Sequence, residues 1–296
     1  MNQPLAYVHP GAKIAKNVVI EPYTTISNNV IIGEGSWLGS NVTIMEGARI
    51  GKNCNIFPGS VISAVPQDLK FDGEESFVEI GDNTTIRECV TINRGTKDRL
   101  TTKVGSNCLI MAYCHIAHDC SVGNNSIFSN NSTLAGHVNI GQHVILAGMV
   151  AIHQFCTIGD HAFISGGSLV RKDVPPYVKA AREPLSYVGI NSVGLRRRGF
   201  STKKIKDIQL GDNTKGGEVT GVFQFKATDE IHDYKGVTVA GSYAYDSGFS
   251  IAAGLSSTTA TTETTEDDEG VSTTTTTSPG ILTTEGADTY AIEAAY

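Results

Sequence analysis

The spacing of apolar side chains restricts the fold of this chain more than any other feature of its sequence. Between residues 110 and 152, every sixth position holds Ile, Val, Phe or Leu. This period is neither that of a helix nor that of a plain strand, but it is typical of a parallel β-helix, in which each short strand forms one wall of a coil. With three walls to a coil, residues 18 apart lie above one another. We therefore expect an all-β solenoid with these apolar anchors pointing inward.

The repeat runs from Val8 to Val170 and is interrupted twice, at residues 64–77 and 94–102. Charged insertions that leave a repeat are commonly functional, and we expect this of the first. For the second, a functional role and a simple surface excursion both remain open.

The sequence changes character after the repeat. Residues 1–190 are expected to form the β-helix domain, and residues 191–210 the start of a C-terminal helical region. Residues 211–255 alternate apolar and polar side chains with glycine turns, which predicts an atypical β-like segment. Residues 256–296 are rich in Thr, Ser and acidic residues, a composition that favours a disordered tail.

Charge and hydropathy limit the partners and the compartment. Residues 1–206 carry 20 basic and 15 acidic side chains, whereas residues 207–296 carry 3 and 15. A mildly basic body suits anionic ligands such as a nucleotide diphosphate or an acidic carrier protein, although a solvated surface gives the same balance. We expect no nucleic-acid partner. Because no apolar run approaches the roughly 20 residues of a membrane span, and the N-terminus lacks an apolar signal core, we expect a cytoplasmic protein without stable membrane insertion.

Five of the eight histidines lie between residues 115 and 153. His118, Gly136 and Gln154 are 18 residues apart, so they are predicted to stack at one place in three successive coils. By the same spacing Asp119 lies under His137, and His153 falls in the neighbouring column. The sequence thus gathers an imidazole, a carboxylate and a bare backbone N–H at one spot.

This grouping has a chemical interpretation. His118 can remove a proton from an alcohol, Asp119 can orient it, and the N–H of Gly136 can meet a developing oxyanion. No GxSxG elbow is present, and five of the six cysteines fall at tight corners where small buried side chains are needed, so a covalent acyl-enzyme is disfavoured. We expect no metal either, because the spacings differ from the histidine pattern of the β-helical carbonic anhydrases.

Several stretches resemble one known family. They are PQDLK (66–70), EIGDNTTIRECVTINRGT (79–96), HIAHDC (115–120), TLAGHV (133–138), AIHQF (151–155), DVPPYV (173–178) and GLRRRGF (194–200). They resemble the bacterial acyl-carrier-protein:UDP-N-acetylglucosamine O-acyltransferases of lipid A biosynthesis, over about residues 1–208. The resemblance implies a homotrimer of left-handed β-helices with sites between subunits. It also implies transfer of a 3-hydroxyacyl chain from acyl carrier protein to the 3-hydroxyl of UDP-N-acetylglucosamine, without a cofactor.

The resemblance also implies roles for individual residues. His118 corresponds to the general base, Asp119 to its polarising partner and Gly136 to the oxyanion donor. Residues expected to bind substrate are Gln67, Asp68 and Lys70 at the glucosamine, His115, His137, His153 and Gln154 along the channel, Gly166 at the acyl chain, and Asn191, Arg197 and Arg198 at the nucleotide. A glycine at 166 implies a long acyl chain. Val193 stands where the family has a glutamate that contacts the nucleotide.

One alternative of a different class is retained. A trimeric β-solenoid could serve as a non-catalytic scaffold or binding protein derived from that enzyme, because the chain departs from the family after Lys206, where family members continue into a helical domain. An N-acyltransferase of the same pathway is disfavoured, because such enzymes carry an N-terminal uridine-binding domain and here the hexads begin at Val8.

Overall fold

The computed structural model describes residues 5–210 and six short strands beyond them, at residues 236–238, 243–244, 250–251, 256–258, 261–266 and 272–277. The chain divides into two compact units, Met1–Asp212 and Asn213–Tyr296.

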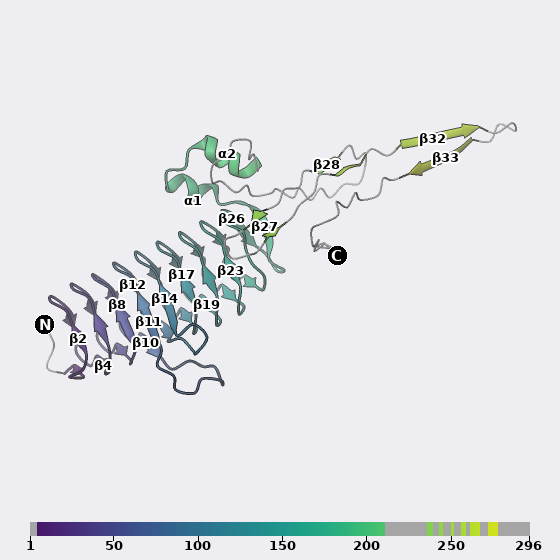
Figure 1. Cartoon of the computed structure of the whole chain (residues 1–296). Coiled ribbons are helices and arrows are strands. Elements are labelled where there is room, and N and C mark those ends of the chain that lie inside the picture. The colour runs from purple at the N-terminus through teal and green to yellow at the C-terminus, as the bar shows by residue number, and fades with distance from the viewer. Residues whose placement is uncertain are drawn as a thin grey trace. The chain divides into compact units, whose positions relative to one another are not determined.

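The first unit is a left-handed parallel β-helix whose strands form three walls (Figure 1). Wall 1 consists of β1 (Tyr7–Val8), β4 (Thr25–Ile26), β7 (Thr43–Ile44), β10 (Val61–Ala64), β13 (Thr91–Asn93), β16 (His115–Ile116), β19 (Thr133–Leu134), β22 (Ala151–Ile152) and β25 (Leu169–Val170). Wall 2 consists of β2 (Lys13–Ile14), β5 (Ile31–Ile32), β8 (Ala48–Ile50), β11 (Phe77–Ile80), β14 (Thr101–Val104), β17 (Ser121–Val122), β20 (Asn139–Ile140) and β23 (Thr157–Ile158). Wall 3 consists of β3 (Val19–Ile20), β6 (Trp37–Leu38), β9 (Asn55–Ile56), β12 (Thr85–Ile86), β15 (Leu109–Ile110), β18 (Ile127–Phe128), β21 (Ile145–Leu146), β24 (Phe163–Ile164), β26 (Val178–Ala181) and β27 (Ser186–Ile190).

The apolar anchors form the core, as the spacing predicts. Each of the strands β1 to β25 contains one anchor, and anchors in successive coils pair across a wall, for example Ile116 with Leu134 and Leu134 with Ile152. From Ile20 onward their exposed fraction is at most 4%. Burying one Ile or Leu side chain is worth about 1.5–3 kcal/mol, so this column of anchors supplies most of the driving force for the coil.

Tight corners between the walls require residues with positive φ. Many corners use asparagine, which tolerates this conformation, at positions 17, 29, 41, 53, 83, 107, 125 and 131. The corner between walls 1 and 2 uses Asn29 in an early coil, but Asp119, His137 and Phe155 in three successive later coils, with φ of 58°, 64° and 67°. Other side chains therefore replace asparagine in these three turns.

Both interruptions of the repeat leave the solenoid at the same corner, between walls 1 and 2. The first loop, residues 65–76, joins β10 to β11, and the second loop, residues 94–100, joins β13 to β14 one coil later. The loops lie side by side in dark blue in Figure 1. Although Ile62 and Ile80 are 18 residues apart, they lie in different walls, because the first loop is inserted at a corner and replaces no strand.

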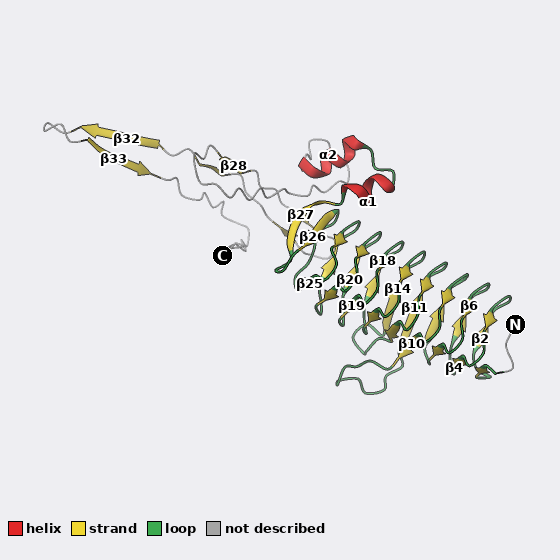
Figure 2. Cartoon of the chain, turned by 180° about the vertical axis from the view of Figure 1, so that it is seen from behind, coloured by secondary structure: helices red, strands yellow, loops and turns green. Residues whose placement is uncertain are grey.

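Two helices follow the last coil (Figure 2). Helix α1 (Ser192–Arg197) begins at Asn191, whose side-chain oxygen accepts a hydrogen bond from the N–H of Gly194. Helix α2 (Thr202–Leu210) contributes the buried residues Ile205 and Ile208, and α1 contributes Leu195. No helix in the described part of the chain has the length and apolar character that a membrane crossing requires.

In the second unit the described strands pair two by two and antiparallel. They are β28 (Gly236–Thr238) with β31 (Ser256–Thr258), β29 (Tyr243–Ala244) with β30 (Ser250–Ile251), and β32 (Thr261–Glu266) with β33 (Ser272–Thr277). The rest of the predicted β-like segment and disordered tail lies outside the described residues, and those predictions remain predictions.

Candidate active site

The stacked residues of the corner between walls 1 and 2 form the candidate site. Three successive turns, residues 117–120, 135–138 and 153–156, connect wall 1 to wall 2 directly above one another. They carry His118, Gly136 and Gln154 in one column, as the spacing of 18 residues predicts. His118 and Gly136 are buried, whereas Gln154 and the neighbouring His153 are exposed.

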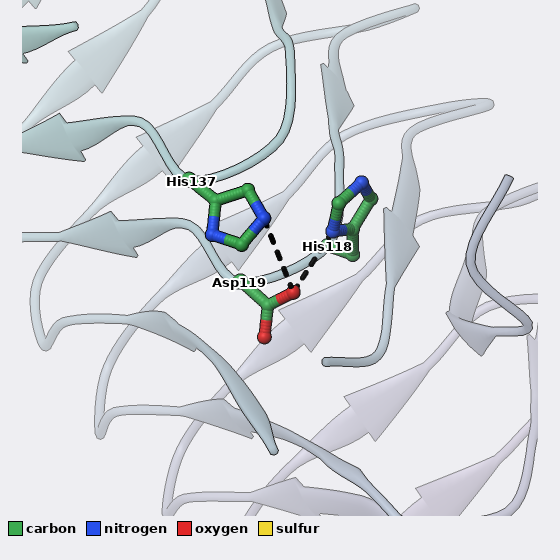
Figure 3. Close-up of side chains that lie close together, drawn as sticks. All are labelled: His118, Asp119 and His137. Carbon is green, nitrogen blue, oxygen red and sulfur yellow. Dashed lines mark hydrogen bonds and ion pairs between the residues drawn. The ribbon is translucent and has the colours of Figure 1, made fainter. Parts of the chain in front are cut away.

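His118 and Asp119 form a buried pair. Nδ1 of His118 lies 2.8 Å from Oδ2 of Asp119, and the two residues are 6% and 0% exposed. Figure 3 shows His118 and His137 directed at the same carboxylate oxygen. An ionised carboxylate only accepts hydrogen bonds, so the proton of a neutral His118 resides on Nδ1 and Nε2 is left as the basic atom.

Asp119 is held in its ionised form. Burial by itself raises the pKa of the carboxyl group, but hydrogen bonds from His118 and from the hydroxyl and backbone N–H of Thr96 outweigh burial, with help from the nearby His137. The pKa of Asp119 therefore lies below its ordinary value.

Gly136 lies against the free edge of the His118 ring. A β-carbon placed on Gly136 would lie 2.6 Å from Nε2 of His118 and 3.1 Å from Nε2 of Gln154, so only glycine fits here. Among residues 5–210, no acceptor bonds to the N–H of Gly136. The backbone of Gly136, with its unused N–H donor, therefore lies beside the basic nitrogen of His118, and acyl transfer through an oxyanion needs a donor near the base.

His137 and His115 flank this pair. His137 is 7% exposed, its Nε2 lies 3.9 Å from Oδ2 of Asp119, and its ring stacks on Phe155 with centroids 4.7 Å apart. His115 contacts Thr91, whose hydroxyl oxygen lies 2.7 Å from its Nδ1. Burial, together with the nearby His118, lowers the pKa of His115, which keeps this ring neutral.

The second loop contributes residues that the sequence alone did not identify. The hydroxyl of Thr96 donates to Asp119 at 2.7 Å, the N–H of Arg99 donates to it at 3.2 Å, and Asp98 lies 3.2 Å from Nδ1 of His137. The insertion at residues 94–102 is therefore more than a surface excursion, because this loop encloses the carboxylate. In the sequence, the feature that could have identified this loop as part of the site was its position one coil before the histidine column.

The first loop starts from the same corner, two coils before His118. Gln67 and Lys70 are exposed and Asp68 is half-buried, and an oxygen of Asp68 accepts a hydrogen bond from the N–H of Lys70 at 2.9 Å. The loops are linked, since Glu74 accepts a hydrogen bond from the N–H of Lys97 at 2.7 Å. Polar side chains of the first loop thus line the same edge of the solenoid as His118.

The remaining predicted binding residues lie at the other two corners. Gly166 is exposed at the corner between walls 3 and 1, where an added β-carbon would lie 3.0 Å from the carbonyl oxygen of Gly148. Asn191 is buried; its side chain caps α1 and donates to the carbonyl oxygen of His161 at 2.9 Å. Arg197 is exposed, whereas Arg198 is half-buried and has one buried guanidinium nitrogen without a partner among the described residues. One chain therefore does not bring all of these residues together.

The group His118, Asp119 and His137 also has the dimensions of a metal site. One possible ligand atom from each lies within 4.8 Å of the others. The carboxylate, however, already accepts hydrogen bonds from Thr96 Oγ1, the N–H groups of Thr96 and Arg99, and Nδ1 of His118. Because its lone pairs are committed to these donors, the donor set suits a proton-transfer pair better than a cation.

Cysteine chemistry is disfavoured at the site. All six cysteines are free, and Cys120, directly after Asp119, is buried. Burial raises the pKa of Cys120 to about 12, so its thiol stays protonated at neutral pH. This agrees with the prediction that the corner cysteines are buried thiols.

Comparisons with known proteins point to hexapeptide-repeat acyltransferases, in agreement with the geometry of the site. Residues 29–64 and 101–136 match the family described as bacterial transferase hexapeptide (six repeats), and residues 173–210 match the second domain of UDP N-acetylglucosamine O-acyltransferase. A crystal structure of a UDP-N-acetylglucosamine acyltransferase from Bacteroides fragilis is 51% identical with a TM-score of 0.70, covering 71% of this chain and 82% of that one. The enzyme from Francisella novicida is 46% identical with a TM-score of 0.70, covering 71% and 77%.

Curated relatives include proteins named acyl-[acyl-carrier-protein]–UDP-N-acetylglucosamine O-acyltransferase. An acyl-[acyl-carrier-protein]–UDP-N-acetylglucosamine O-acyltransferase from Herminiimonas arsenicoxydans is 46% identical over 151 residues, which is 51% of this chain and 58% of that protein. The chain thus spans less than two thirds of this relative. The protein of that name from Thiobacillus denitrificans is 46% identical over 207 residues, 70% of this chain and 80% of the relative. The chain therefore belongs to the UDP-N-acetylglucosamine O-acyltransferase family of hexapeptide-repeat proteins.

Proposed function

We propose that the protein transfers a 3-hydroxyacyl group from acyl carrier protein to the 3-hydroxyl of UDP-N-acetylglucosamine, the first step of lipid A biosynthesis. The observation that carries this proposal is the close approach of Gly136 to Nε2 of His118, where an added β-carbon would lie 2.6 Å from that nitrogen, with Nδ1 held by Asp119. The substrates follow from the names of the relatives and structural neighbours. The buried cysteines support direct transfer to the sugar without an acyl-enzyme.

The geometry supports a single-displacement mechanism. Nε2 of His118 takes the proton of the sugar hydroxyl as its oxygen attacks the thioester carbonyl carbon. The N–H of Gly136 donates to the carbonyl oxygen as it gains negative charge, and Asp119 stabilises the imidazolium. The carbon–sulfur bond then breaks, the ester carbonyl re-forms, and the carrier thiolate takes the proton from His118. Atoms and charge balance without a cofactor.

We further propose that the protein acts as a homotrimer in the cytoplasm, with residues 1–190 as the catalytic β-helix and the region from residue 191 as its C-terminal extension. Support for a shared site comes from the distribution of the proposed residues over three corners of one chain. Within one chain Gln67, Asp68 and Lys70 share an edge with His118, His115, His137, His153 and Gln154, but Gly166, Asn191, Arg197 and Arg198 do not. A neighbouring copy can supply the missing acyl and nucleotide contacts.

The test is direct. The full chain is incubated with UDP-N-acetylglucosamine and a 3-hydroxyacyl carrier protein, and the products are identified by mass spectrometry. We expect an acylated nucleotide sugar, and a decrease in kcat of roughly 10²- to 10⁴-fold in His118→Ala. The variant should retain the size and thermal unfolding of the wild type. Absence of product from the wild-type chain would favour the scaffold, and near-normal turnover of His118→Ala would remove the base from the mechanism.

A further inference from the structure

The second loop lies over the Asp119 carboxylate and has no role in the mechanism above. We infer that Thr96 is a positioning residue for the acyl transfer, holding the Asp119 carboxylate in place against Nδ1 of His118. This inference rests on the proposed function, because it assigns a residue to the reaction of the same site.

The hydrogen bonds of Thr96 account for both carboxylate oxygens. Its backbone N–H lies 3.0 Å from Oδ1 and 3.1 Å from Oδ2 of Asp119, and its hydroxyl donates to Oδ2 at 2.7 Å. Thr96 is only 6% exposed, so water does not easily replace its hydroxyl. Hydrogen bonds to a charged group are among the strongest in proteins, and these fix the plane of the carboxylate.

The loop that carries Thr96 is itself anchored. The guanidinium of Arg99 donates to the backbone carbonyl of Asp119 and to the side chain of Asn139, both at 2.9 Å. In β14, the strand that follows the loop, the hydroxyl oxygen of Thr102 accepts a hydrogen bond from the N–H of Asp119 at 2.8 Å. Because the loop is tied to Asp119 from several sides, Thr96 has a fixed position from which to hold the carboxylate.

The hydroxyl is the part of Thr96 that another residue cannot replace. Any residue at this position except proline supplies the N–H, but only Thr or Ser supplies an O–H donor to Oδ2, the oxygen that also faces Nδ1 of His118. Without the hydroxyl, Oδ2 keeps only the 3.1 Å bond from the N–H of Thr96 beside its contact with Nδ1, so the carboxylate is held less firmly against the imidazole. The imidazole then loses its orientation toward Gly136, since the pair acts through one shared oxygen.

Thr96→Val keeps the shape of the side chain and removes the hydroxyl, which donates to Asp119 at 2.7 Å and accepts a longer hydrogen bond from the N–H of Asp98 at 3.4 Å. We expect kcat to fall by roughly 10- to 100-fold, the factor that corresponds to losing one hydrogen bond to a charged group, with KM for the nucleotide sugar nearly unchanged. Thr96→Ser should remain within about threefold of the wild type, because the O–H donor is restored. A rise in KM at constant kcat, or equal loss in the Ser and Val variants, would overturn the inference.

A pH profile separates positioning from general loss of stability. The groups that face Asp119 are His118, His137 and Arg99, with Cys120 directly after it. Losing the Thr96 hydroxyl should shift the acid limb of kcat in Thr96→Val to higher pH, because the ionised carboxylate loses a donor. An unshifted acid limb together with full activity would show that the hydroxyl has no role. Thr24→Val is the matched control: Thr24 is also buried and donates to the carbonyl oxygen of Gly39 in a distant coil.

A second readout does not depend on activity. In 15N-histidine-labelled protein, NMR reports which ring nitrogen of His118 carries the proton, and we expect the Nδ1-protonated form in the wild type and in Thr96→Ser, with a mixture in Thr96→Val. If the wild type makes no acylated sugar yet shows this pattern, the proposed function fails and the positioning role stands. If the wild type is active but Thr96→Val has the same tautomer and kcat, the positioning role fails alone. Should Thr96→Val not fold, Thr96→Ala is measured in the same way.

Discussion

Gly136 and His118 approach each other so closely that a β-carbon on Gly136 would lie 2.6 Å from both Cε1 and Nε2 of the imidazole. The ring has little freedom to withdraw, because its other nitrogen is bonded to Asp119. The glycine is thus required by the position of the base, whereas the positive φ of this turn falls on His137.

Gly136→Ala is expected to lower kcat by about 100-fold, because the methyl group pushes the imidazole out of line with the reacting hydroxyl. Steady-state kinetics with both substrates measures this. Gly148→Ala is the control for folding, since a β-carbon there meets only one atom within 4 Å, at 3.5 Å, and its thermal unfolding should equal that of the wild type. An active Gly136→Ala protein would contradict the assigned geometry of the base.

The division of the proposed residues among corners predicts complementation between subunits. His118→Ala and Arg198→Ala should each be impaired alone, whereas co-expressed chains should form mixed trimers in which about a third of the interfaces carry both residues intact. Activity above the sum of the two parent proteins, measured after purification through two different tags, would support a shared site. Light scattering on the same samples should report trimers. A monomer with full activity, or no recovery, would show that one chain forms the site by itself.

The stack of His161 between His143 and Tyr177 predicts acid sensitivity. Ring centroids lie 4.7 Å and 5.4 Å apart, and burial, with the charges of His143 and Arg198, lowers the pKa of His161 to about 4 against the smaller opposing effect of Asp160. An unfolded histidine has a pKa near 6.5, so between about pH 6.5 and pH 4 the unfolded chain binds more protons. Folding stability from this group is therefore lost as the pH falls through that window.

His161→Phe keeps an aromatic ring in the stack and cannot be protonated. The quantity compared is the loss of free energy of unfolding between pH 7 and pH 4. This loss should be smaller in His161→Phe than in the wild type, by up to about 3 kcal/mol. Urea unfolding at several pH values measures the difference, with His9→Phe as a control in the first coils. Parallel stability curves for the wild type and His161→Phe would refute the assigned titration.

The boundary between the two compact units predicts the result of truncation. All three walls and both helices lie within Met1–Asp212. A chain ending at Asp212 should therefore keep its far-UV circular dichroism, its oligomeric state and its kcat within about twofold, because none of the hydrogen bonds of the site comes from beyond that residue in the described chain. Loss of the trimer on truncation would instead assign residues 213–296 to assembly.

Much of this architecture follows from local pattern. With one apolar anchor in every six residues, short strands stacked in register are the way to bury the anchors. The resulting coils of 18 residues bring His118, Gly136 and Gln154 together. Periodicity is additive along the chain, so a position in the repeat can be counted from its neighbours.

Insertions interrupt the repeat, so the position of a residue after an insertion cannot be counted from the sequence. Only the tertiary structure shows which wall that residue belongs to. Ile62 and Ile80 are 18 residues apart, yet they lie in different walls, because a loop of arbitrary length can leave a corner and return to it. The same freedom lets Thr96, which is 23 residues before Asp119, reach its carboxylate. Which donors surround a buried carboxylate depends on where a loop folds back, and the packing of the loop against the coil determines that, not the repeat.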